Sequence, residues 1–198
     1  MTGVQTCALP ISHYATVLRI LRYLKGTLFH GIFYLAQSLL VLCAFSDVDW
    51  AGDPIDHRFT TSYCFLLGSS LISWRSKKQT FVARSSTETE YRAFVDTTSK
   101  LLWLQWLLKD LGVSTSSATP LYSDNQSVIH IAHNDVFHER TKHIEINCHF
   151  IRYHLVHGAL KFFSVSSKYQ LADIFTKSLP KGRTRDLVEN LKLVSHPP

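Results

Sequence analysis

Three acidic residues stand where the sequence pattern changes from one kind of element to the next, and a fourth lies within a helical pattern. Asp47 ends a short apolar run, Glu90 lies in the first turn of a long helical pattern, and Asp124 lies at a strand-to-helix junction. Asp173 lies in a later helical segment beside apolar residues. Carboxylates at strand ends commonly form sites in the crevice outside an α/β sheet. Four hard oxygen donors gathered there would suit Mg²⁺ or Mn²⁺, and two such ions about 4 Å apart can cleave a phosphodiester bond.

Each of these acidic residues also has a purely structural explanation. Glu90 could be the partner of Thr87 in a capping box, and Asp124 could cap the helix that follows it. Asp173 could pair with Lys177 four residues later on a solvated helix face. Asp47 could be one of several acidic residues in a turn. Spacing alone does not decide between these explanations and a metal site.

The histidines form a second candidate constellation, because most of the eleven lie between His130 and His157. Imidazole is a common zinc ligand, but structural zinc sites usually also recruit closely spaced thiolates. Here the nearby Cys148 adjoins His149 and no C-x-x-C pair exists. We therefore expect no zinc site and interpret most of these histidines as exposed or substrate-facing.

Length and composition restrict the class of protein. The 198 residues, 45% of them hydrophobic and 18% charged, indicate one main globular domain with appendages and exclude a collagenous or low-complexity chain. The 21 Lys and Arg against 15 Asp and Glu give a net charge of +6, which favours a polyanionic partner. Four scattered cysteines without paired spacing argue against a disulfide scaffold and for a reducing compartment.

Two segments near the N-terminus have unusual sequences. Residues 26–45 carry no formal charge over twenty positions, but polar residues interrupt the run and its β-rich makeup favours two short buried strands, so we expect no membrane span. Residues 2–11 resemble translated sequencing adapter, and we exclude residues 1–12 from the fold as an artefactual or disordered tail. The biological sequence is then expected to start near Ser12, in mid-gene.

Hydrophobic periodicity predicts an α/β layout with a mixed sheet, in which an antiparallel group precedes alternating helices and strands. The strongest signal is a helix over 86–111 with apolar residues at i, i+3, i+4 and i+7. The other expected elements are a helix at 14–24, a strand at 39–45 running into an acidic turn, a hairpin of 62–67 with 71–74, a third antiparallel piece at 80–84, a strand at 120–123, a helix to about 133, a helix at 141–157, a strand at 159–165, a helix at 169–178 and an amphipathic tail at 181–193.

Seven motifs in a fixed order give the chain a specific resemblance. They are RILRYLKG at 19–26, FSDVDWAGDP at 45–54, LISWRSKK at 71–78, RSSTETEYRA at 84–93, LYSDNQS at 121–127, HERTKHIEI at 138–146 and QLADIFTKSL at 170–179. From about residue 13 to about 193, the chain resembles the C-terminal part of plant copia-type LTR retrotransposon Pol polyproteins. The matching region is the ribonuclease H domain with the connection segment before it.

The resemblance implies a ribonuclease H-like fold, which is a five-stranded mixed sheet flanked by helices. It also implies that Asp47, Glu90, Asp124 and Asp173 form a four-carboxylate site for two Mg²⁺ ions, with Mn²⁺ as a substitute. The implied reaction is hydrolysis of the RNA strand of RNA–DNA hybrids, with one ion activating water and the other stabilising the leaving oxygen. Asp49 shares a strand face with Asp47 and competes with it for the first position.

The resemblance further implies the partners and the domain limits. The partners are the RNA–DNA hybrid and the reverse transcriptase domain of the parent polyprotein, in the cytoplasm within virus-like particles or in the nucleus. The expected divisions are a tail at 1–12, a connection remnant at 13–40, the ribonuclease H domain at 41–180 and a C-terminal tail at 181–198. Candidate phosphate contacts are the basic residues around the site, namely Arg75, Lys77, Lys78, Arg84, Arg140 and Lys142.

Departures from the family pattern leave a second hypothesis for the function open. Many related nucleases carry a mobile histidine just before the last aspartate, whereas residues 166–169 here contain none. Ser62 and Asn147 replace the family's usual Gly and Asp, and no Asp-Asp pair of a polymerase is present. The alternative is a catalytically dead retroelement remnant that at most binds nucleic acid.

Overall fold

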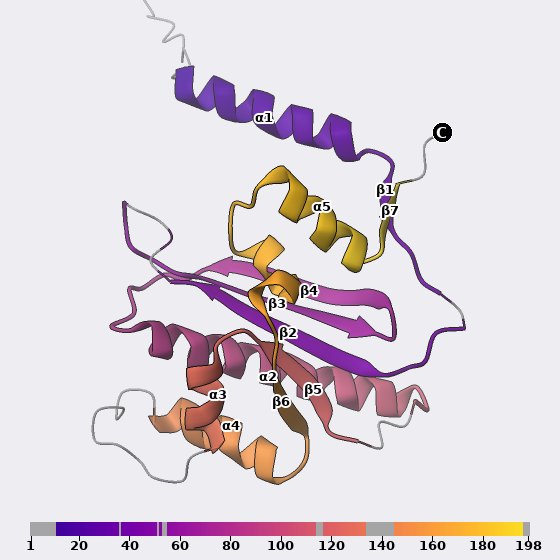
Figure 1. The fold of residues 1–198 in the computed structure, drawn as a ribbon, viewed down its shortest axis with the longest axis vertical. Helices are drawn as coiled ribbons and strands as arrows, with labels where there is room; N and C mark the ends of the chain where they lie inside the picture. The colour runs from indigo at the N-terminus through magenta and orange to yellow at the C-terminus, as the bar shows by residue number, and fades with distance from the viewer. Residues whose placement is uncertain are drawn as a thin grey trace, which may run out of the picture. The chain divides into compact units, whose positions relative to one another are not determined.

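A five-stranded mixed sheet forms the core of the larger compact unit of the chain in the computed structural model (Figure 1). The strand order is β4-β3-β2-β5-β6; β2, β3 and β4 pair antiparallel, while β5 and β6 run parallel to β2. The strand bounds are β2 Leu42–Asp49, β3 Thr60–Leu67, β4 Ser70–Lys78, β5 Thr119–Ser123 and β6 Leu160–Ser164. This confirms the predicted α/β fold class and its mixed sheet.

The structure describes residues 11–35, 37–50, 52, 55–113, 117–133 and 145–195. The chain divides into two compact units, Met1–Phe33 with Leu193–Pro198 and Tyr34–Lys192. In the first unit, α1 (Ile11–Thr27) precedes β1 (His30–Ile32), which pairs antiparallel with β7 (Leu193–Ser195). The second unit contains the sheet and the acidic residues.

The β3–β4 hairpin follows from its sequence. Two strands rich in aromatic and β-branched residues flank Gly68, which adopts a φ of 60°. A side chain at Gly68 would collide with Ser38 and with the carbonyl of Leu39, so the close approach as well as the left-handed backbone requires glycine. The predicted hairpin at 62–67 and 71–74 is therefore present with longer strands.

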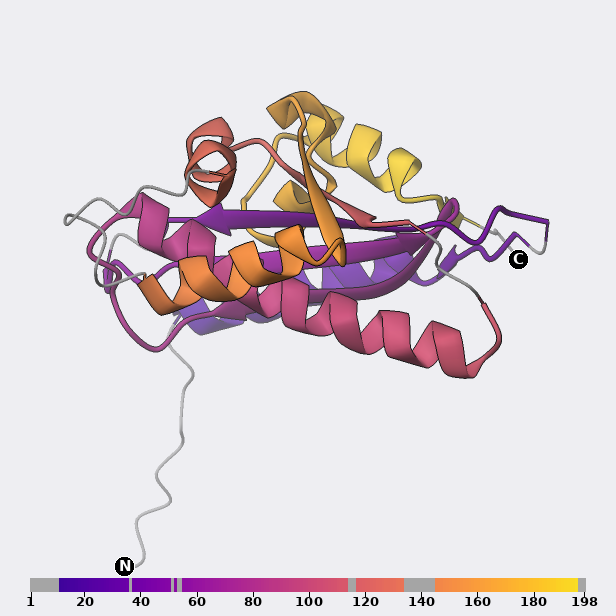
Figure 2. The same ribbon diagram turned by 90° about the horizontal axis from the view of Figure 1, so that it is seen from below.

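The helix α2 (Ser86–Asp110) covers one face of the sheet, and a short 3₁₀ helix, η3 (Leu171–Phe175), packs on the other (Figure 2). On the α2 face, Phe94 and Leu101 join the buried core with Phe65 of β3. The remaining helices are α3 (Gln126–His133), α4 (Glu145–Val156), η2 (Ser167–Tyr169) and α5 (Lys181–Asn190), the last of which contacts η3.

Three sequence predictions for individual elements are wrong. The strand predicted at 39–45 is β2, which continues to Asp49, so Asp47 lies inside a strand rather than in an acidic turn. Residues 80–84 form no strand, because they lead into the N-terminus of α2, where the Arg84 amide donates to the Glu88 carboxylate. The helix predicted at 169–178 is replaced by η2 and η3, whose turns are each capped by the side chain preceding them.

Some predictions fall on residues that the structure does not describe. Residues 1–10 of the expected tail lie outside the described residues, and α1 begins at Ile11. Residues 141–144 also lie outside the described residues. The helix predicted over 141–157 is therefore described from Glu145 onward, as α4. Within the described ranges, no helix has both the length and the apolar character needed to cross a membrane.

Candidate active site

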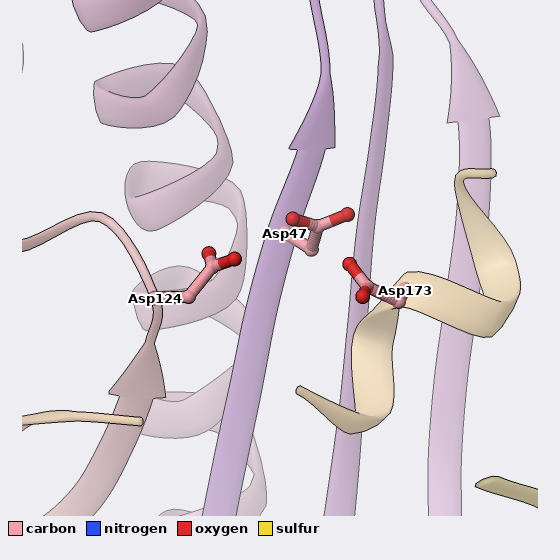
Figure 3. Close-up of side chains that lie close together, drawn as sticks. All are labelled: Asp47, Asp124 and Asp173. Atoms are coloured by element: carbon pink, nitrogen blue, oxygen red, sulfur yellow. The ribbon is translucent and has the colours of Figure 1, made fainter. Parts of the chain in front are cut away.

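Three aspartates from separate parts of the chain converge at one edge of the sheet (Figure 3). Asp47 comes from β2, Asp124 from the loop after β5, and Asp173 from η3; one carboxylate oxygen of each lies within 4.8 Å of the others. Among the described residues, this is the one group of three or more His, Cys, Asp or Glu side chains close enough to share a metal ion. The parallel strands β2 and β5 bring their carboxyl ends to the same edge, which is where α/β sheets commonly carry sites.

Asp47, rather than Asp49, occupies the first position of this group. Both side chains project from the same face of β2, but Asp49 is the last residue of the strand and is half-exposed. Asp47 is only 2% exposed and lies opposite Ser62 on β3, beneath η3. Of the two aspartates that the sequence offers for the first position, Asp47 is therefore the one that belongs to the cluster.

Asp173 reaches the cluster because hydrogen bonds hold η3 on the sheet. The fully buried Gln170 donates from Nε2 to the Ser46 carbonyl at 3.0 Å, and its Oε1 accepts from the Ala172 amide at 3.3 Å. Ser62 Oγ donates to the Ala172 carbonyl at 3.0 Å. These contacts place η3 beside the end of β2, next to Asp47.

Asp124 is available to the cluster because its neighbour caps the helix instead. Asn125 Oδ1 accepts from the Val128 amide at 3.2 Å and so caps α3. The carboxylate of Asp124 accepts from Ser167 Oγ at 2.9 Å. The capping explanation considered for Asp124 therefore belongs to Asn125.

Glu90 lines the same cleft but is not a member of the three-aspartate group. Ser85 Oγ accepts from the Glu88 amide at 3.2 Å, so Ser85 and Glu88 cap α2 and Glu90 does not. Glu90 Oε1 accepts instead from Asn125 Nδ2 at 3.4 Å. The open cleft has a volume of about 470 Å³ and is lined by Asp47, Val48, Glu90, Asp124, Asn125, Gln126, Ser127 and Lys177.

Burial shifts the pKa values of two carboxyl groups in the cleft. Burial raises the pKa of Asp47 to about 6, although Lys177 and a hydrogen bond from Thr176 oppose this shift. Burial, together with the neighbouring Asp47 carboxylate, raises the pKa of Glu90 to about 8. Desolvation alone would lower the pKa of the Lys177 ammonium, but Asp47 and Asp173 outweigh it and raise that pKa. The site therefore favours bound positive charge.

The donor set fits a hard divalent cation. Converging carboxylate oxygens are the ligands that Mg²⁺ and Mn²⁺ prefer, and soft thiolate ligands are absent from the lining residues of this cleft. Burial of two of the three aspartates fixes their positions, so little side-chain conformational entropy would be lost on binding a cation.

Sequence reasoning missed several residues that organise the site. Four polar side chains make hydrogen bonds that hold the carboxylates or their supporting elements, namely Asn125, Gln170, Ser167 and Thr176. From the sequence alone, Lys177 is expected only to pair with Asp173 on a solvated helix face. The available signal was position, since all of these polar side chains except Ser167 lie within four residues of an aspartate of the cluster.

The structure describes four of the six basic candidates for phosphate contact, and none of these four lines the cleft. Arg75 forms an ion pair with Asp96 of α2 at 3.6 Å, on the opposite face of the sheet from Asp47. Lys78 pairs with Asp56 at 2.9 Å, and Lys77 is exposed. Arg84 is exposed and precedes the cap of α2. Arg140 and Lys142 lie outside the described residues.

The sheet order and its covering helices define the class of fold. The crystal structure of LC11-RNase H1 in complex with an RNA/DNA hybrid aligns with this chain with a TM-score of 0.51 and 11% sequence identity. The alignment covers 68% of this chain and 93% of the LC11-RNase H1 chain. At this identity the likeness concerns the fold, and the chain has a ribonuclease H-like fold.

Sequence comparison then finds relatives of this chain among larger polyproteins. The chain is 44% identical over 186 residues, 94% of its length, to the retrovirus-related Pol polyproteins from transposons RE2 and RE1 of Arabidopsis thaliana. It is 36% identical over 171 residues to the corresponding polyprotein from transposon TNT 1-94 of Nicotiana tabacum. The resemblance to copia-type Pol polyproteins is thus confirmed. The chain spans about 13% of the length of these curated relatives, and no family model matches it.

Proposed function

We propose that this chain is the ribonuclease H segment of a retrotransposon Pol polyprotein and hydrolyses the RNA strand of RNA–DNA hybrids. The observation that carries the proposal is the convergence of Asp47, Asp124 and Asp173 at one sheet edge, with Glu90 lining the same cleft. The ribonuclease H-like fold and the Pol polyprotein relatives support it. The domain core is proposed as residues 41–180.

The residues proposed to hold Mg²⁺ are Asp47, Glu90, Asp124 and Asp173. Bound divalent ions supply Lewis acidity, which activates an attacking water and stabilises the leaving oxygen of a phosphodiester. The chain's own contribution is to hold these carboxylates in place before a cation arrives. Asn125 orients Glu90 by its amide, and Glu90 has to lose the proton that its raised pKa favours before it can act as a ligand.

The proposed substrate and partners follow from the relatives. An RNA–DNA hybrid presents a phosphate backbone to the open cleft, and the net charge of +6 favours such a polyanion. The reverse transcriptase domain is proposed as the neighbour within the parent polyprotein, since the relatives are much longer Pol polyproteins.

The test is cleavage of a labelled RNA–DNA hybrid by the purified chain in Mg²⁺. We expect the RNA strand to be cut, and Asp47→Asn or Asp124→Asn to abolish the cutting. Asp49→Asn is the matched control, because Asp49 shares the strand and face of Asp47 but lies outside the cluster. Salt-dependent hybrid binding without Mg²⁺-stimulated cleavage would refute the proposal and select a non-catalytic remnant.

A further inference from the structure

The ammonium of Lys177 lies between two of the clustered carboxylates. Nζ is 2.7 Å from Asp173 Oδ1 and 3.1 Å from Asp47 Oδ1. The Lys177 amide also donates to the Asp173 carbonyl at 3.0 Å, which fixes the start of this side chain beside η3. Lys177 is thus a built part of the cleft and not a solvated partner of Asp173 alone.

Every oxygen of these two carboxylates has a donor or cation close to it. Asp47 Oδ2 accepts from the Thr176 hydroxyl, and Asp47 Oδ1 accepts from Lys177. Asp173 Oδ1 accepts from Lys177, and Asp173 Oδ2 lies 3.5 Å from the Arg183 guanidinium. A metal ion that bridges both carboxylates would lie between them, where the Lys177 ammonium lies in this structure. The ammonium is the one partner that engages both.

Exposure indicates which group moves. The side chain of Lys177 is 35% exposed, whereas those of Asp47 and Asp173 are 2% and 8% exposed. A lysine has a flexible four-carbon stem, so its ammonium can turn to water while the two carboxylates stay in place. An ammonium and a divalent ion both carry positive charge, so they also repel each other at the same pair of ligands.

We propose that Lys177 is a resident cation that competes with the divalent metal ion for Asp47 and Asp173. It keeps the carboxylates together in the metal-free chain and leaves them when the metal ion binds. This inference rests on the proposed function for the identity of the metal site, but it concerns binding of the ion and not cleavage.

The experiment measures Mn²⁺ binding to the full chain without nucleic acid, by electron paramagnetic resonance of the free ion. Lys177→Met removes the charge and keeps the length of the side chain, and we expect it to lower the Kd for Mn²⁺ by about tenfold or more. Lys161→Met is the control for net charge, because Lys161 lies on β6 and is exposed, and its Kd should match the parent protein. Lys177→Arg restores a cation and should return the Kd toward the parent value.

Thermal unfolding gives a second measurement, which reports both the stability of the metal-free chain and the stabilisation by Mn²⁺. We expect Lys177→Met to have a lower Tm than the parent protein in EDTA, because two buried carboxylates lose their shared cation, and to gain more Tm on addition of Mn²⁺. A Kd for Lys177→Met within twofold of the parent protein, or equal Mn²⁺ gains in Tm, would overturn the proposal. A chain that fails to cleave hybrid but shows the tenfold difference refutes the proposed function and supports the role of Lys177.

Discussion

Replacement of Gln170 by alanine tests whether the position of Asp173 depends on one buried amide. Gln170 is fully buried, and its Nε2 supplies a hydrogen bond to the carbonyl of Ser46, one residue before Asp47. Its Oε1 also accepts from the Ala172 amide, one residue before Asp173. The side chain therefore connects the two backbone segments that carry these carboxylates.

The expected cost follows from these contacts. Loss of the donor to a buried carbonyl costs about 1–3 kcal/mol, and the truncated side chain leaves a cavity that adds about 1 kcal/mol. We expect Gln170→Ala to lower the free energy of unfolding by about 3 kcal/mol in urea titrations, which a domain of ordinary stability survives. Hybrid cleavage, measured where both proteins are folded, should fall by about tenfold or more because Asp173 loses its fixed position.

Gln105→Ala is the matched control. Gln105 Nε2 also makes two hydrogen bonds, at 2.8 Å to Thr119 Oγ1 and at 2.9 Å to the Ala159 carbonyl, away from the cleft. We expect a cost in the free energy of unfolding of about 1–2 kcal/mol and no change in cleavage. The reasoning about Gln170 is refuted if Gln170→Ala destabilises no more than this control and leaves cleavage intact.

Two further predictions concern Glu90 and Asn125. The pKa of Glu90 in the folded chain is about 8, above its unfolded value, so the metal-free protein should lose stability as pH rises through 8. Glu90→Gln should therefore gain stability relative to the parent protein between pH 5 and pH 9 by on the order of 4 kcal/mol, measured by urea unfolding in EDTA; a constant difference would contradict the assigned shift. Asn125→Ala should cost about 1 kcal/mol through loss of the α3 cap, and this cost should increase with pH because the amide lowers the pKa of Glu90. Asn125→Ser keeps a capping oxygen, so its cost should be smaller at low pH, and equal costs for both variants there would argue against the capping role.

The main elements of the fold were predictable because their signals are local. The long helix α2 shows apolar residues at helical spacing and a capping motif at its start, and the hairpin β3–β4 surrounds a turn that only glycine fits. The four acidic residues could also be picked out, since three stand at a change of element and all four lie in motifs of the family resemblance. Local patterns failed at 169–178, where hydrogen bonds to residues distant in sequence hold the chain. They also failed at 80–84, which lead into the capped start of α2 instead of forming a strand.

The capping alternatives show why spacing could not decide the site. Both Ser85 with Glu88 and Thr87 with Glu90 fit a capping box, and only the register of α2 on the sheet selects the first. Likewise, only the folded loop assigns the α3 cap to Asn125 and leaves Asp124 for the cleft.

The sequence by itself determined the class of fold, the family resemblance and the four candidate acids, because hydrophobic periodicity and ordered motifs are properties of neighbouring residues. Tertiary structure alone decided that Asp47 and not Asp49 joins the cluster and that Glu90 stands beside the three aspartates. It alone placed Lys177 between two carboxylates that are 126 positions apart in the sequence. The physical reason is that hydrogen bonds and ion pairs between distant segments fix these positions, and their partners cannot be read from local spacing.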